Sequence, residues 1–218
     1  MEDEEAFDGL SEAYRFLQVA VGIIAVSLPP AVWAFRAIRL TTFSLMDSIS
    51  AHYYTPSRNL FVGALCALGV FFLSYQAKPL PHYENDRWLG RAAGVMAIAV
   101  AWFPTAPPGR TKPADWANHV HVIAAISLFL LLGYIANFVF TRTGSGQPTR
   151  EKMQRNLVYR ICGGVIAVAL VVGLACMLLR VDGSTHWLFW VETLAIEAFG
   201  VSWLIKSGRT PILRDAGS

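Results

Sequence analysis

Residues 118–140 read NHVHVIAAISLFLLLGYIANFVF, a run without a single Lys, Arg, Asp or Glu. A helix of about 20 apolar residues crosses the hydrocarbon core of a bilayer, so this stretch predicts a transmembrane helix. Five further segments have the same character and lie near 15–35, 59–77, 88–104, 159–179 and 186–205. We therefore predict an all-α, polytopic membrane protein, in which residues 1–218 form a single six-transmembrane-helix domain.

Composition supports a membrane protein. The chain is 55% hydrophobic and 15% charged, where a soluble domain has about 25% charged residues. Three cysteines lie in apolar segments and form no CxxC pair, which argues against a redox motif or a cysteine zinc cage. The net charge of +3 is modest, and basic residues gather near segment ends. This pattern predicts membrane lipids, and no nucleic acid, as partners.

Basic residues also predict the orientation. With six spans both termini share a side, and 12 of the 18 basic residues fall there: Arg15, Lys78, Arg87, Arg91, Arg142, Arg150, Lys152, Arg155, Arg160, Lys206, Arg209 and Arg214. The positive-inside rule then places the termini in the cytoplasm. The acidic tail before Arg15 lacks a basic start, so we expect a frayed end and no signal peptide. We therefore expect a multi-pass protein that is located in a bacterial inner membrane.

Residues 47–59, DSISAHYYTPSRN, form the most polar run and fall in the first outer loop. Long ordered loops tend to carry function, so we expect this run to wall an outward-facing pocket. Thr55 and Pro56 predict a helix start, and Asp47 could pair with Arg58. The candidate ligand-pocket residues are Asp47, Ser48, Ser50, His52, Tyr53, Tyr54, Arg58, Asn59, Asp115 and Glu192.

Four histidines are expected at this same face, and they suggest a metal site. His119 and His121 are two apart, so only one can face a shared site, and Asp115 four residues earlier favours His119. Together with Glu192, neutral imidazoles could hold zinc. The candidate ligands are His52, His119, His186 and Glu192. The competing expectation is no cofactor, with the histidines as ordinary interfacial residues.

Glu192 and Glu197 lie within the predicted sixth helix. Acids inside a membrane span are costly and usually face the bundle interior, which makes both candidates for function. For Glu197 we expect a structural role, as a buried and hydrogen-bonded carboxyl. Gly90 and Gly94 form a GxxxG pattern that predicts close packing between helices.

Four stretches carry a resemblance to known proteins: DSISAHYYTPSRNLFVGALCALGVFFLSYQ, VAWFPT, RNLVYRICG and WVETLAIEAFGVSWLIK. They resemble a family of uncharacterised bacterial six-helix membrane proteins, distantly similar to the DRAM/Frag group. The resemblance implies a fold and a membrane location but no activity. Ser48 and His52 also resemble the Ser-x-x-x-His element of the alkaline ceramidase superfamily. His119 and His121 depart from that superfamily's His-x-x-x-His spacing, and six helices replace its seven.

The sequence thus predicts a membrane protein that binds a lipid or small ligand in an outward-facing polar pocket. A zinc-dependent membrane hydrolase acting on lipids is the alternative. A small transporter or channel, with Glu192 and Glu197 lining its path, is the third. P-loop, HExxH and GxSxG motifs are absent from the sequence, and whether the protein is an enzyme stays open.

Overall fold

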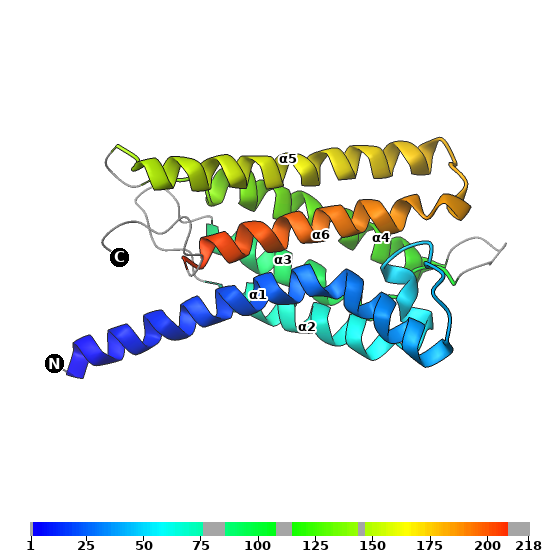
Figure 1. Ribbon diagram of the computed structural model, residues 1–218, viewed down its shortest axis with the longest axis horizontal. Coiled ribbons are helices and arrows are strands. Elements are labelled where there is room, and N and C mark those ends of the chain that lie inside the picture. The colour runs from blue at the N-terminus through cyan, green and yellow to red at the C-terminus, as the bar shows by residue number, and fades with distance from the viewer. Residues whose placement is uncertain (1, 76–85, 108–114, 144–146, 209–218) are drawn as a thin grey trace.

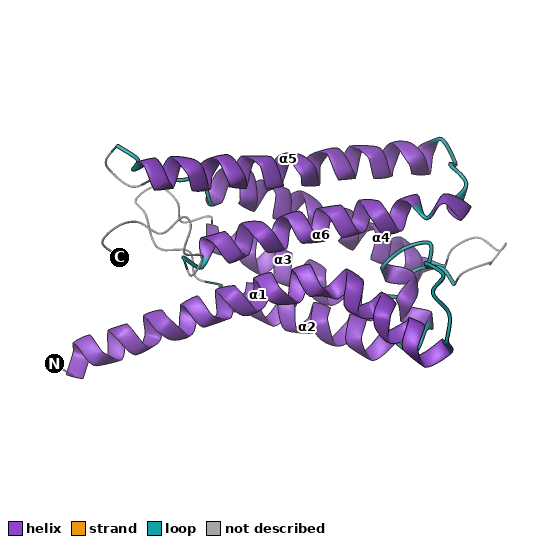
Figure 2. Ribbon diagram, viewed as in Figure 1, coloured by secondary structure: helices purple, strands orange, loops and turns teal. Residues whose placement is uncertain are grey.

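The computed structural model describes residues 2–75, 86–107, 115–143 and 147–208, and all regular elements in these ranges are helices (Figures 1 and 2). They are α1 (Glu2–Leu40), the 3₁₀-helix η1 (Ser50–Tyr54), α2 (Arg58–Ser74), α3 (Asp86–Trp102), α4 (Trp116–Tyr134), the π-helix η2 (Ile135–Val139), α5 (Arg150–Leu178), the 3₁₀-helix η3 (Gly183–Thr185) and α6 (Trp187–Lys206). The all-α prediction is confirmed.

The six α-helices form a closed ring. Each packs against its neighbours in the chain, and α6 returns to pack against α1. Figure 1 shows the helices running side by side, with η1 at one end of the bundle and the N-terminus at the other. We call these the η1 end and the terminal end. α6 runs between α5 and α1, and begins at the η1 end.

Four helical segments are long and apolar enough to cross a membrane: Arg15–Leu40, Trp116–Val139, Arg150–Leu178 and Trp187–Lys206. They make the chain a multi-pass membrane protein. α2 is also apolar but has 17 residues, and α3 has 17 as well. At 1.5 Å per residue, each of these two extends about 25 Å, close to the lower limit for a span. Six spans therefore remain a prediction.

Glycines bring neighbouring helices into close contact. A Cβ added to Gly94 of α3 would lie 2.7 Å from the Gly69 carbonyl oxygen of α2. A Cβ on Gly200 of α6 would lie 3.0 Å from the Gly22 carbonyl oxygen of α1. Backbone atoms cannot move aside as a flexible side chain can, so these crossings require the missing side chain. The packing role predicted for Gly94 agrees with this geometry.

Several helices begin or end away from the predicted positions. α1 starts at Glu2, so the predicted frayed tail is wrong, and α5 starts at Arg150 rather than near 159. The Thr149 side chain caps α5 by accepting the Lys152 amide at 3.1 Å. α2 starts at Arg58 after Ser57, two residues beyond the predicted cap Thr55. Hydropathy marks the part of a helix that suits lipid, while polar turns extend helices beyond it.

Candidate functional site

Residues 47–57, here called the cap segment, close the η1 end of the bundle. Local hydrogen bonds fix their shape. The Ser48 hydroxyl accepts the Ala51 amide at 2.9 Å, and the Thr55 hydroxyl donates to the His52 carbonyl at 2.8 Å. Side chains of this kind commonly organise turns by bonding to nearby backbone. The cap segment is therefore an ordered element, and its Ser48, Ser50, His52 and Ser57 are buried.

Glu192 of α6 is the main anchor of the cap segment. Its Oε2 accepts the Ile49 amide at 2.6 Å, and its Oε1 accepts the Ser50 hydroxyl at 3.3 Å. One turn earlier, the Phe189 amide donates to the Asp47 carbonyl at 3.0 Å. That amide lies in the first turn of α6, where backbone donors lack partners within the helix. Three hydrogen bonds thus join the cap segment to the start of α6.

Two further hydrogen bonds hold the cap segment across the ring. The Ser57 hydroxyl donates to the Val32 carbonyl of α1 at 2.7 Å, just after Pro29 and Pro30 within that helix. The Tyr54 hydroxyl donates to the Thr105 carbonyl, after α3, at 2.6 Å. The cap segment therefore forms hydrogen bonds with α6, with α1 and with the residues after α3. Such contacts are expected of a lid rather than of a simple connecting loop.

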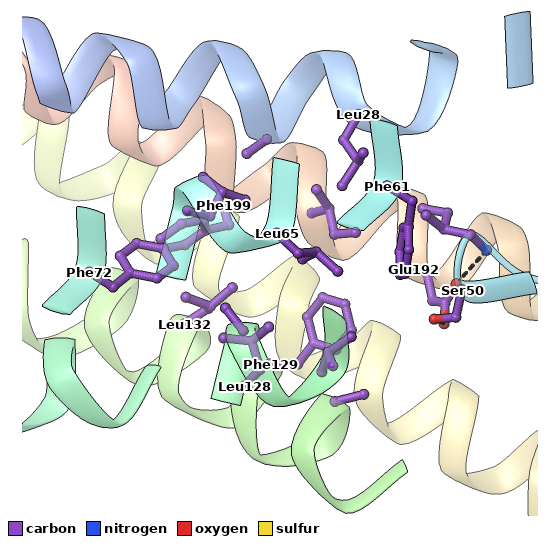
Figure 3. Close-up of a pocket in the computed structure, with 17 residues that line it drawn as sticks. Leu28, Ser50, Phe61, Leu65, Phe72, Leu128, Phe129, Leu132, Glu192 and Phe199 are labelled. Atoms are coloured by element: carbon purple, nitrogen blue, oxygen red, sulfur yellow. Dashed lines mark hydrogen bonds between the residues drawn. The ribbon is translucent and has the colours of Figure 1, made fainter. Parts of the chain in front are cut away.

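A cavity of about 50 Å³ lies inside the ring, beneath the cap segment. The cap segment and the helices α1, α2, α3, α4 and α6 line it. Its walls come from Ala25, Leu28, Ile49, Ser50, Phe61, Leu65, Leu68, Phe72, Ala97, Val100, Ala125, Leu128, Phe129, Leu132, Glu192, Ile196 and Phe199. Figure 3 shows Ser50 and Glu192 together near one end, and Phe72 near the other. The cavity is apolar with one polar end.

The His52 side chain of the cap segment is fully buried, with its ring centroid 6.3 Å from that of Phe189. Its Nδ1 lies 3.1 Å from the Ile49 carbonyl oxygen. A carbonyl only accepts, so this contact places the proton on Nδ1 and leaves Nε2 as an acceptor. Nε2 has no partner among the described residues. Burial lowers the pKa of His52, the Ile49 and Ser48 backbone raises it, and the Arg36 guanidinium lowers it further.

The predicted pocket residues take different positions. Ser50 and Glu192 line the cavity, while the predicted partners Asp47 and Arg58 do not pair. The Asp47 carboxylate lies 3.4 Å from His186 Nδ1. The Arg58 guanidinium donates to the Tyr53 hydroxyl at 2.7 Å and lies over the Tyr53 ring. Tyr53 lies in η1, five residues before Arg58, and the sequence alone did not predict this contact. Asn59 is exposed.

The preference for His119 over His121 is wrong. His119 is exposed, and its Nδ1 bonds to the Asp115 backbone carbonyl at 2.9 Å rather than to the carboxylate. That carboxylate instead caps α4 by accepting the Asn118 amide at 3.1 Å. His121 is buried and donates from Nδ1 to the Phe103 carbonyl at 2.7 Å. N-capping, a common use of Asp, explains Asp115 without a metal.

The zinc hypothesis gains no support from the arrangement. In the part of the chain that the structure describes, no three His, Cys, Asp or Glu side chains gather as a metal would require. Among the candidate ligands, His52 and His119 hydrogen-bond backbone carbonyls, His186 faces Asp47, and Glu192 holds the cap segment. Zinc binding therefore stays a prediction, and so does the hydrolase that depends on it.

The apolar lining was not identified from the sequence. Ala97, Ala125 and Leu128 look like any other residues of an apolar span, and only their shared position inside the ring makes them a cavity wall. A usable signal was the small size of Ala97 and Ala125 on two neighbouring helices, which leaves room between them. Glu197 does not line this cavity, although Glu192, five residues earlier on the same helix, does.

Comparison with family models, with curated proteins and with solved structures finds no match for this chain. Function must therefore be argued from the cavity, the cap segment and Glu192.

Proposed function

We propose that this protein binds a single-chain lipid, or a small ligand with an apolar tail, in the cavity beneath the cap segment. The observation that carries the proposal is the pairing of an apolar cavity with a polar end made by Glu192 and Ser50. Apolar cavities of this kind stay dry and accept apolar molecules.

We further propose that all six helices cross a bacterial inner membrane with both termini in the cytoplasm, as the distribution of basic residues predicts.

The size of the cavity favours a chain over a bulky group. Its 50 Å³ compares with roughly 10–15 Å³ for one water on the same measure, so it is small. The labelled wall residues in Figure 3 run along the bundle from Glu192 towards Phe72. A small, extended and apolar space suits one hydrocarbon chain. A ring system or a two-chain headgroup would require the walls to move.

The polar end favours a ligand that donates hydrogen bonds. A carboxylate has about four acceptor positions, and Ile49 and Ser50 use two on Glu192. The remaining positions can accept from a hydroxyl or ammonium group, whereas a deprotonated carboxylate brings no donor to them. We therefore expect the protein to bind long-chain alcohols and amines more tightly than fatty acids of equal length.

The test uses dodecanol, dodecylamine and dodecanoate, which share a chain and differ in their polar ends. Each is added to the purified full-length protein in detergent, and native mass spectrometry measures the bound fraction. Dodecanol and dodecylamine should bind more tightly than dodecanoate. Ala97→Phe fills the cavity and should weaken binding about tenfold or more, as expected when about 1.4 kcal/mol of binding free energy is lost.

The matched control is Ala167→Phe, which adds the same side chain on the exposed face of α5. This variant should bind as the original protein does. If Ala97→Phe does not fold, the smaller Ala125→Leu change narrows the same cavity. Equal binding by the cavity variants and the control would refute the proposal.

A further inference from the structure

Glu197 is a carboxyl in the middle of a membrane-crossing helix. It lies ten residues from the start of α6 at Trp187 and nine from its end at Lys206. At 1.5 Å per residue, this places it about 15 Å from the η1 end of the helix. Acids at this depth are costly in lipid and normally have a partner.

Glu197 lies on the lipid-facing side of α6. Residues seven and three before it and four after it share its face. These are Trp190, Leu194 and Val201, whose side chains are 52%, 54% and 40% exposed. Glu192, by contrast, is rotated by about 140° and faces the cavity. Glu197 therefore belongs to a surface distinct from the proposed ligand site, here called the Glu197 face and formed by Trp190, Leu194, Glu197 and Val201.

Glu197 makes no hydrogen bond or ion pair with the residues that the structure describes. The expectation of a buried, hydrogen-bonded carboxyl is wrong, because Glu197 is partly exposed and unbonded. Its carboxyl oxygens therefore have no partner among the described residues. A partner from outside the bundle would satisfy them.

Thr193 is a polar side chain near Glu197 that is shielded inside the bundle. It lies one turn before Glu197 on the same side of α6, and is only 8% exposed. Its hydroxyl has no hydrogen bond in the described structure. Hydroxyls in membrane helices usually bond to a carbonyl in the preceding turn, as Ser202 does to Phe199 at 2.7 Å. Because the Thr193 hydroxyl is shielded, it cannot meet a partner outside the bundle, and Glu197 supplies the polar group of the Glu197 face.

We propose that the Glu197 face binds a transmembrane helix of another protein that carries a lysine or arginine at mid-membrane depth. A cation complements a carboxyl at this depth, because ionisable residues within membrane helices commonly pair with one another. A lysine ammonium has three donors, enough for both oxygens of the Glu197 carboxylate. The exposed Trp190, Leu194 and Val201 side chains would pack against the apolar remainder of that helix.

A second copy of this chain does not fit this role. In a copy with the same orientation, Glu197 would meet groups at its own depth. Arg160 is exposed on α5, but it lies 18 residues from the η1 end of that helix, about 27 Å along it. Within the described helices, the other basic side chains also lie near one end of the bundle. A copy would therefore oppose Glu197 with another carboxyl.

The test uses synthetic transmembrane peptides and the full-length protein in phosphatidylcholine vesicles. One peptide is a leucine helix with a central lysine, the second is all leucine, and the third carries its lysine two turns from the centre. Energy transfer between the labelled protein and each peptide measures association. The central-lysine peptide should associate roughly 3- to 30-fold more tightly than the all-leucine peptide, the range that a polar contact between membrane helices provides.

Glu197→Gln removes the charge and keeps the shape, and should reduce association of the central-lysine peptide to the all-leucine level. Glu197→Asp should retain most of it, and Glu192→Gln serves as the control that leaves the Glu197 face intact. Moving the lysine two turns should also abolish the preference. The proposal is overturned by equal association of the central-lysine and all-leucine peptides, by a preference that survives Glu197→Gln, or by self-association of the protein that Glu197→Gln removes.

Discussion

The Glu192 carboxylate accepts the backbone amide of Ile49 at 2.6 Å, across 143 positions of the chain. Together with the Ser50 and Phe189 hydrogen bonds, this contact joins the last membrane-crossing helix to the cap segment, at the polar end of the cavity. A hydrogen bond that a backbone amide donates to a carboxylate is among the stronger kinds in proteins. Because both groups are shielded, removing the acceptor leaves an amide without a partner.

Glu192→Ala should therefore loosen the cap segment. We expect faster hydrogen exchange at the Ile49 amide and a loss of about 1–3 kcal/mol of stability, the cost of an unsatisfied shielded donor. Hydrogen exchange measured by mass spectrometry over residues 45–58 tests this. Glu197→Ala changes the same residue type on the same helix without touching the cap segment, and should leave exchange there unchanged. Equal protection in the two variants would show that Glu192 does not hold the cap.

His52 should make stability depend on pH. Burial lowers the pKa of His52 below its ordinary value of 6.5, so the unfolded chain binds a proton more readily than the folded one. Its contribution is complete above about pH 6.5 and is lost as the pH falls towards the folded pKa, at up to about 1.4 kcal/mol per pH unit. Thermal unfolding at about pH 7.5 and about pH 5.5 measures this dependence. His52→Gln should reduce the loss, whereas His119→Gln, at an exposed position, should not.

The sequence predicts the helices better than it predicts the site. Apolar runs identified all six helices, because each must present apolar side chains over most of its length. Helix ends were less well predicted, since polar turns at Glu2–Arg15 and at Arg150 continue the helix beyond the apolar run. The sequence predicts the polar run at 47–59 to be the organised part of this end of the bundle. Two of the predicted pocket residues, Ser50 and Glu192, do form a hydrogen bond there.

Contacts across the ring could not be predicted in the same way. Asp47 was expected to pair with Arg58, but α6 brings His186 to Asp47 and the η1 turn brings Tyr53 to Arg58. His119 and His121 lie on roughly opposite sides of α4. Their spacing of two residues does not show which of these sides faces α3. Such contacts depend on how helices rotate when they pack, which a single sequence records only weakly.

The Gly94 crossing predicts opposite effects for two identical substitutions. Gly94→Ala places a Cβ 2.7 Å from the Gly69 carbonyl oxygen, so α2 and α3 must separate, at a cost of about 1–3 kcal/mol. Gly63→Ala, on α2, meets no atom within 4 Å and should be neutral or stabilising by up to about 1 kcal/mol. Thermal unfolding in detergent compares the two. An equal loss of stability in both variants would contradict a tight crossing at Gly94.

The orientation of the bundle can be tested by labelling single cysteines in intact cells, in a background without Cys66, Cys162 and Cys176. Ser57 is a poor position despite its loop location, because it is fully buried and its hydroxyl bonds to Val32. Ser44 is exposed at the η1 end, and Thr143 is exposed between η2 and α5. If the termini are cytoplasmic, as the basic residues predict, a membrane-impermeant maleimide should label Ser44→Cys and leave Thr143→Cys unlabelled until the membrane is permeabilised. The reverse pattern would place the cap segment in the cytoplasm, and the cavity would then open to cytoplasmic ligands.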